Sequence, residues 1–218
     1  MRTPEATLTR SYSYGWQQFK KYFLHLFLVG LITWVAWIPT NVAFWQDMSA
    51  GVAALNIFAA AYGILLVPVI NYGAQHAYLR YMRDERVDIR DVFSGFKTNY
   101  LNIILANLLV FAICGIGFLL LIVPGIVFAC RLAFVPYLVM DKGLDPVAAI
   151  EKSWNMTRGH GWRIFAMFLV AIPLFVVGLL LLGIGAFFSA LLVACAFASL
   201  YYAVDVEELA LLNANGTA

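Results

Sequence analysis

Between Leu101 and Met140 the chain runs for about 40 residues with one charged side chain, Arg131. A helix that crosses a hydrocarbon core roughly 30 Å thick needs about 20 apolar residues. The run is therefore too long for one span, and we expect it to fold back as a hairpin. Pro124-Gly125 is the best turn signal near its middle, and the Gly-Ile-Gly at 115–117 is the alternative, because Gly and Pro interrupt helices.

The composition of the whole chain also indicates a membrane protein. Hydrophobic residues make up 63% and charged residues 12% of the 218 positions, whereas a soluble domain carries about 25% charge. We therefore predict an all-α polytopic protein: a single membrane domain with six transmembrane helices as three hairpins. The expected spans are 22–38, 51–72, 100–122, 125–140, 162–182 and 184–204, followed by an acidic tail at 205–218. This length leaves no room for a soluble catalytic domain of ordinary size.

Basic residues in the loops predict the orientation. All of the 14 Lys and Arg residues except Arg131 lie before the first span, between spans two and three, or between spans four and five. The other three connections carry no base. Because Lys and Arg concentrate on the cytoplasmic side, we expect both termini in the cytoplasm. The net charge of +2 is too small to indicate nucleic-acid binding.

A similar segment precedes each predicted hairpin. In each, an aromatic residue is followed four positions later by a base: Trp16 and Lys20, Phe93 and Lys97, Trp154 and Arg158. Helix-start signals lie upstream at Thr3-Pro4, Asp88 and Asp145-Pro146. We interpret the segments as short amphipathic cytoplasmic helices in the headgroup region and as signs of a threefold internal repeat. The alternative is that aromatic and basic residues flank the spans of any polytopic protein.

Arg131 is the candidate site inside the membrane. A charge there costs about 2.5–3.5 kcal/mol on insertion scales, so it needs a partner. If the fourth span starts near Gly125, Arg131 lies about 9 Å along the helix from the outer end, within reach of Asp47 on the outer loop. Outer headgroup phosphates, or carbonyls freed by a break at Pro124 or Pro136, are the other options. Arg131 is thus either a structural clamp or a contact to a lipid or ligand phosphate.

Other polar and small residues in the spans favour helix packing. The amides Asn56, Asn71, Asn102 and Asn107 are expected to hydrogen-bond between helices, and Ala186, Ala190, Ala194 and Ala198 form a face that permits close approach. The cysteines lie in apolar runs without metal-ligand spacing, and the histidines belong to no metal or catalytic motif. We expect no catalytic residue, metal or cofactor.

Five short segments follow one another along the chain: DVFSGF at 91–96, VPGI at 123–126, RLAFVP at 131–136, DKG at 141–143 and AIEKSW at 149–154. Together they resemble a bacterial group of uncharacterised six-helix integral membrane proteins, over roughly residues 10–200. That group is similar to the membrane domain fused to some glycerophosphodiester phosphodiesterases. In the fused proteins the hydrolase chemistry belongs to a separate soluble domain, so the resemblance implies an architecture and no activity. Together with the compact, loop-poor form, the resemblance also implies a location in the bacterial inner membrane.

Three functions remain open. The first is a non-enzymatic membrane module that interacts with membrane lipids or organises a membrane-protein partner through its basic cytoplasmic face. The second is a transporter or channel for a small solute or lipid, with Arg131 as an anion contact. The third is an enzyme acting on lipid headgroups, which lacks a recognisable nucleophile or metal site. The first is the function that we expect. The acidic tail is expected to pair with the basic segments of the same chain.

Overall fold

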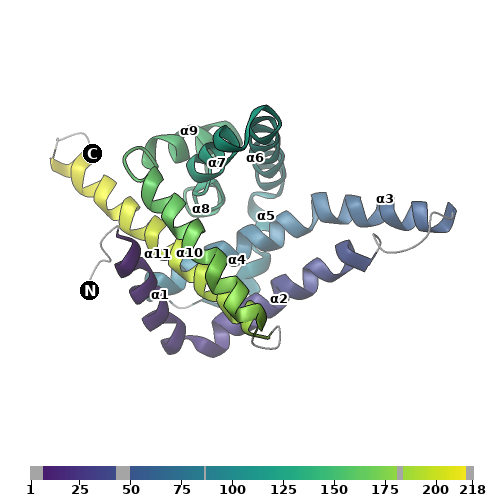
Figure 1. The fold of residues 1–218 in the computed structure, drawn as a ribbon, viewed down its shortest axis with the longest axis horizontal. Coiled ribbons are helices and arrows are strands. Elements are labelled where there is room, and N and C mark those ends of the chain that lie inside the picture. The colour runs from purple at the N-terminus through teal and green to yellow at the C-terminus, as the bar shows by residue number, and fades with distance from the viewer. Residues whose placement is uncertain (1–6, 43–49, 86, 181–183, 215–218) are drawn as a thin grey trace.

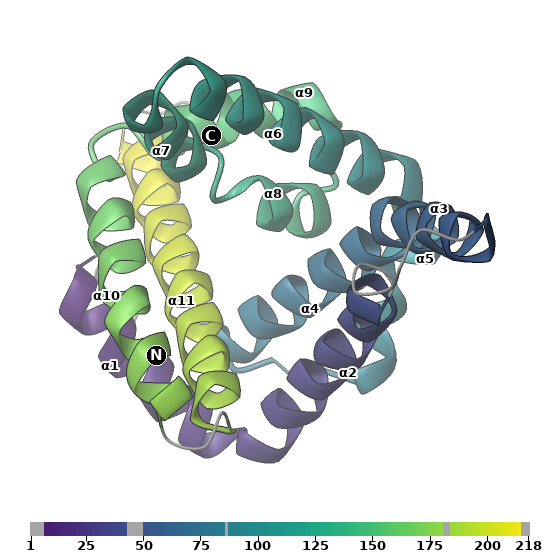
Figure 2. The same ribbon diagram turned by 45° about the vertical axis from the view of Figure 1, so that its right-hand side comes forward.

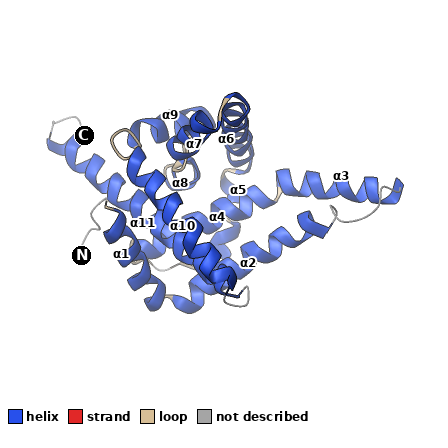
Figure 3. Cartoon of the chain, viewed as in Figure 1, coloured by secondary structure: helices blue, strands red, loops and turns tan. Residues whose placement is uncertain are grey.

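The computed structural model describes residues 7–42, 50–85, 87–180 and 184–214, and every regular element among them is a helix (Figures 1 and 3). The elements are α1 (Leu8–Lys21), α2 (Phe23–Val42), α3 (Ala50–Leu65), α4 (Val67–Met82), the 3-10 helix η2 (Ile89–Phe93), α5 (Gly95–Thr98), α6 (Tyr100–Leu120), α7 (Ile122–Arg131), α8 (Val135–Asp141), α9 (Pro146–Met156), α10 (Gly161–Leu180) and α11 (Ile184–Ala214). The all-α prediction is confirmed.

Six helical segments within the described ranges are long and apolar enough to cross a membrane. They are Phe23–Thr40, Ala53–Met82, Tyr100–Leu120, Ile122–Asp141, Gly161–Leu180 and Gly185–Leu211. Large apolar side chains are exposed on the outward faces of these segments, and Leu119, for example, is 88% exposed. Contact of so much apolar surface with water would be unfavourable. The chain is therefore a multi-pass helical membrane protein.

The turn between the third and fourth segments lies at Leu121. This residue has an extended backbone between α6 and α7, with φ −164° and ψ 152°, so neither predicted turn is correct. Gly117 and Gly125 lie inside helices instead, where a Cβ on Gly117 would come within 3.0 Å of the Gly125 Cα. The glycines serve the close approach of two antiparallel helices rather than the turn between them.

A second glycine pair, Gly178 and Gly185, lets α10 and α11 approach each other closely in the same way. A Cβ on Gly178 would lie 2.5 Å from the carbonyl oxygen of Gly185. The junction between the predicted spans 162–182 and 184–204 lies outside the described residues, and Ile184 begins α11. The helices α2 and α3 differ from these pairs, because α3 extends away from the other helices (Figure 1).

The fourth segment is interrupted after Arg131. The ten residues of α7 rise only about 15 Å, and a turn at 132–134 leads into the short helix α8. Phe134 and Tyr137, at this turn and in α8, pack on Tyr201 of α11 with ring centroids 5.5 and 5.0 Å apart. All three are buried, so α8 forms the centre of the core. The predicted continuous span at 125–140 is therefore two helices.

The last and first helices also differ from the predicted boundaries. α11 continues through most of the predicted tail, to Ala214, and α4 continues past the second predicted span to Met82. The first helix α1 lies along α11, and a Cβ on Gly15 would lie 3.2 Å from the backbone nitrogen of Ala196.

Two of the three helix-start signals form caps. Asp88 accepts a hydrogen bond from the Arg90 backbone and forms a capping box with Asp91, and Asp145 caps α9 by accepting from the Ala148 N–H. The Thr3-Pro4 signal lies outside the described residues. The three segments nevertheless take different forms: one long helix (α1), a 3-10 helix followed by a single α turn (η2 and α5), and a helix of eleven residues (α9).

Candidate functional site

The break after α7 is held by a side chain from α9. The Ser153 hydroxyl donates a hydrogen bond of 2.7 Å to the carbonyl oxygen of Arg131. This carbonyl ends α7 and has no continuing helix to supply its donor. Ser153 is fully buried, so α9 fixes the position of Arg131 relative to the following helices.

We expect Ser153→Ala to lower the free energy of unfolding by about 1 kcal/mol, because it leaves a helix-terminal carbonyl without a close donor. Thermal unfolding in detergent measures this change. Ser13→Ala, at an exposed position of α1, is the control and should unfold as the wild type does. Equal stability of both variants would show that the hydrogen bond contributes nothing.

The Arg131 side chain lies against an aromatic ring without an acidic partner. Its guanidinium carbon is 5.5 Å from the centroid of the Trp154 ring, and the same ring contacts Phe128 at 5.9 Å. The Arg131 Nη1 atom is buried and has no hydrogen-bond partner among the described residues. A cation–π contact compensates only part of the desolvation of a charged group, so this nitrogen can still donate to an anion.

A groove beside Arg131 opens between α7 and the start of α10. It has a volume of about 410 Å³ and is lined by Val123, Ile126, Val127, Cys130, Arg131, Gly161, Trp162 and Phe165. The α7 side chains come from one face of the helix, at spacings of three and four residues. Arg131 is the one charged group in this apolar lining. The groove is thus an almost wholly apolar surface, and the Arg131 side chain that borders it carries a buried N–H donor without a described acceptor.

The position of Arg131 differs from the expected one. It lies nine residues into α7, about 14 Å from its first residue, rather than about 9 Å from the outer end. It contacts Ser153 and Trp154, which belong to the basic segment after the fourth span. The expected partner Asp47 falls outside the described residues, and no described backbone carbonyl accepts from Nη1.

The predicted interfacial residues have separate environments. On α1, the Lys20 ammonium lies 5.0 Å from the Trp16 ring centroid. Phe93 stacks on Phe96 at 6.4 Å, and Lys97 is exposed on α5. Trp154 is the member of this group that contacts Arg131. Arg158 is exposed just after α9, four residues beyond Trp154.

Sequence reasoning missed a cluster of charges that joins α4, α8 and α11. The guanidinium of Arg83 donates to both carboxylate oxygens of Asp141, at 2.5 and 2.8 Å, and lies 3.3 Å from Asp205. Lys142 also bonds Asp205 at 2.5 Å, and the Tyr201 hydroxyl donates to Asp141 at 3.2 Å. Burial lowers the pKa of Arg83, but the two carboxylates outweigh it and raise the pKa overall.

The expected pairing of the acidic tail with the same chain is confirmed for the described residues. Lys152 of α9 forms an ion pair with Glu208, and His160 lies 3.4 Å from Glu207. Asp205 and Glu208 are three residues apart and share a face of α11. No sequence signal pairs these charges with particular partners, since the contacts join residues about 50 to 120 positions apart.

Six apolar segments, a broken fourth span and an arginine in the lining of an apolar groove describe a multi-pass helical membrane protein. Residues 87–214 match the model of a domain of unknown function, DUF7847, and the chain belongs to this family. The matched part runs from η2 through α11 and includes Arg131. No curated protein and no solved structure matches the chain.

Proposed function

We propose that this protein is a non-enzymatic membrane module that binds an anionic phospholipid at Arg131. The single observation that carries the proposal is the buried Nη1 atom of Arg131, which has no acceptor in the described structure, in a residue that lines an apolar groove. A phosphodiester oxygen would accept from this nitrogen, and an acyl chain would lie along the face of α7. Arginine suits a phosphate because its planar fork donates two hydrogen bonds at once.

The surroundings of the groove support a site at the membrane–water boundary. Trp162 lines the groove and is 78% exposed, as is typical of indole rings at the headgroup level. Arg158 and Arg163 are exposed nearby in sequence. Each base close to an anionic leaflet contributes about 1 kcal/mol to membrane attraction, so these residues favour the same class of lipid.

The proposal also includes the finer architecture that the sequence predicts. Both termini are in the cytoplasm of a bacterial cell, the protein is in the inner membrane, and the hairpins carry amphipathic cytoplasmic helices. The exposed bases Arg90 and Lys97 support this orientation, because they follow the second span together with Arg83. In this orientation the Arg131 groove opens toward the cytoplasmic leaflet, and the remaining basic surface is available to a membrane-protein partner.

Ligand-linked thermal unfolding tests the lipid site. In detergent, dioleoyl phosphatidylglycerol is expected to stabilise the wild type more than dioleoyl phosphatidylcholine, by about 2.7 kcal/mol when the lipid exceeds its Kd a hundredfold. Arg131→Gln should lose this difference while the lipid-free protein stays folded with nearly the wild-type stability, because the substitution removes a cation–π contact and no hydrogen bond of Nη1 to a described residue.

Arg158→Gln is the matched control, because it removes an exposed base of the same segment outside the groove. It should keep most of the stabilisation by phosphatidylglycerol. The proposal fails if the two lipids stabilise the wild type equally. It also fails if Arg131→Gln responds as the wild type does, or if this variant unfolds without lipid, since that result would make Arg131 a structural clamp.

A further inference from the structure

A second and larger cavity lies at the centre of the helices, apart from the Arg131 groove. Its volume is about 1060 Å³, near the upper end of the roughly 300–1,000 Å³ of small-molecule sites. Residues of α4, α6, α8, α10 and α11 form most of its lining, and α2, α3 and α7 contribute one residue each. Figure 2 shows how these helices lie relative to one another. We call this cavity the central chamber.

The break between α7 and α8 and the small residues of α11 account for the space. Leu132 and Ala133, in the break, belong to the lining, as do Ala190 and Ala194 of α11. The face of alanines on α11 was expected to pack closely against another span. Only its ends do so, since Ala186 and Ala198 are buried, whereas its middle borders the chamber.

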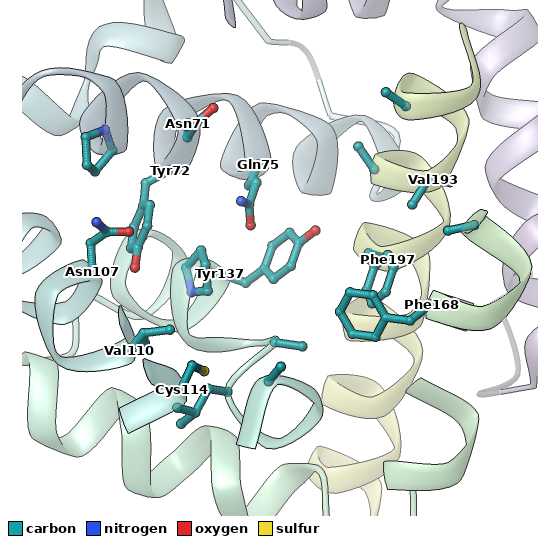
Figure 4. Close-up of a pocket in the computed structure, with 18 of the residues that line it drawn as sticks. Asn71, Tyr72, Gln75, Asn107, Val110, Cys114, Tyr137, Phe168, Val193 and Phe197 are labelled. Atoms are coloured by element: carbon teal, nitrogen blue, oxygen red, sulfur yellow. The ribbon is translucent and has the colours of Figure 1, made fainter. Parts of the chain in front are cut away.

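Polar side chains enter this apolar space without partners. Asn71 and Gln75 lie one turn apart on α4, and Asn107 lies on α6. In Figure 4, Gln75 extends from α4 toward Tyr137, and Asn107 lies beside Tyr72. Asn71 and Asn107 were expected to hydrogen-bond between helices, yet neither they nor Gln75 forms a side-chain hydrogen bond within the described ranges. The Ser189 hydroxyl, by contrast, donates to the Leu174 carbonyl at 2.9 Å.

These amides indicate the chemistry of an occupant. Asn71, Gln75 and Asn107 are each partly exposed, so a group that enters the chamber can reach their amides and hydrogen-bond them. Among the described residues, no Lys, Arg, Asp or Glu lines the chamber, which disfavours a charged headgroup because no described side chain would balance its charge. The occupant therefore combines apolar length with uncharged hydroxyl or carbonyl groups.

We propose that the central chamber binds an uncharged lipid with hydroxyl and ester groups, of the diacylglycerol class. Gln75 and Asn107 hydrogen-bond its polar end, and its acyl chains lie against Phe168, Phe197 and Val193. This site is independent of the anionic lipid at Arg131, which belongs to the lining of the other cavity.

Photo-crosslinking in vesicles tests the chamber. The wild type is reconstituted into phosphatidylcholine vesicles that contain a trace of diacylglycerol with a diazirine in one acyl chain. We expect crosslinked peptides from the chamber walls on α4, α6 and α11, and at least a fivefold loss in Gln75→Leu/Asn107→Leu. Asn56→Leu, which removes an amide of α3 outside the chamber lining, should label as the wild type does, and so should Arg131→Gln.

A second variant keeps the amides and fills the space. Ala194→Phe places a ring in the chamber and should also reduce the labelling, with an unchanged gel-filtration profile as evidence of folding. The proposal is overturned if the exposed lipid-facing residues of α3 are labelled as strongly as the chamber. It is also overturned if a phosphatidylglycerol probe with the same diazirine labels the chamber equally, or if the double amide variant retains the wild-type pattern.

Discussion

Replacement of Arg83 by Met is expected to lower the free energy of unfolding by about 3 kcal/mol, because breaking a buried ion pair leaves the remaining charge uncompensated. The side chains of Arg83 and Asp141 are only 20% and 10% exposed. Without the guanidinium, Asp141 keeps the hydrogen bond from the Tyr201 hydroxyl and loses both bonds from Arg83. Thermal unfolding in detergent measures the change, and the melting temperature should fall by about 6–12 °C on the basis of 2–4 °C per kcal/mol.

An exposed pair on the same side of the molecule supplies the control. Lys21 lies 2.5 Å from Asp84, with the two side chains 52% and 36% exposed. Hydrogen bonds from Lys21 and Tyr22 hold the pKa of Asp84 below its usual value, so this contact persists at neutral pH and weakens only as the pH falls toward that lowered pKa. Lys21→Met should lower the melting temperature far less than Arg83→Met does, because solvent screens an exposed pair.

A double variant separates the charge from the packing. Arg83→Met/Asp141→Leu removes both members of the closest pair and should recover part of the loss, because no uncompensated carboxylate then remains at position 141. If Arg83→Met is no less stable than Lys21→Met, the cluster does not hold α4 and α8 together as the geometry indicates.

Gly73→Ala is the second change with a large expected effect. A Cβ at this position of α4 would lie 1.9 Å from the carbonyl oxygen of Val92 in η2. The obstacle is backbone, which cannot rotate away as a side chain does, so the two elements must separate. We expect a loss at the upper end of the roughly 1–3 kcal/mol typical of overpacking, again measured by thermal unfolding.

The matched control for this variant is Gly115→Ala in α6, where no atom lies within 4 Å of the added carbon. Because alanine favours helix over glycine by about 1 kcal/mol, this variant should be as stable as the wild type or more so. Equal effects of the two substitutions would contradict the close approach of α4 and η2. That approach matters because η2 begins the family-matched region and α4 precedes it.

The large features of the fold follow from apolar runs alone. A run of about 20 apolar residues has one stable form in lipid, a helix that satisfies its own backbone. This physical constraint explains why the six segments were predictable. The turn at Leu121 was not, because Gly117 and Gly125 suit both a turn and a close helix contact, and only the packing of α6 on α7 decides between them.

The parts of the site that could not be predicted depend on contacts between residues that are far apart in the sequence. Arg131 is conspicuous in sequence as a charge within an apolar run, but its neighbour Trp154 is brought to it by the break after α7. The partners of Asp141 lie 58 and 60 residues away in Arg83 and Tyr201. Counting charges by side of the membrane shows where such residues gather and does not show which of them pair.

Native mass spectrometry of the gently purified protein tests the central claim most directly. The wild type is expected to retain an anionic phospholipid from the membrane in which it was produced, and Arg131→Leu is expected to lose it while Arg158→Gln keeps it. Wild-type protein that carries no phospholipid, or the same phospholipid retained by Arg131→Leu, would contradict the assignment of Arg131 as the headgroup contact.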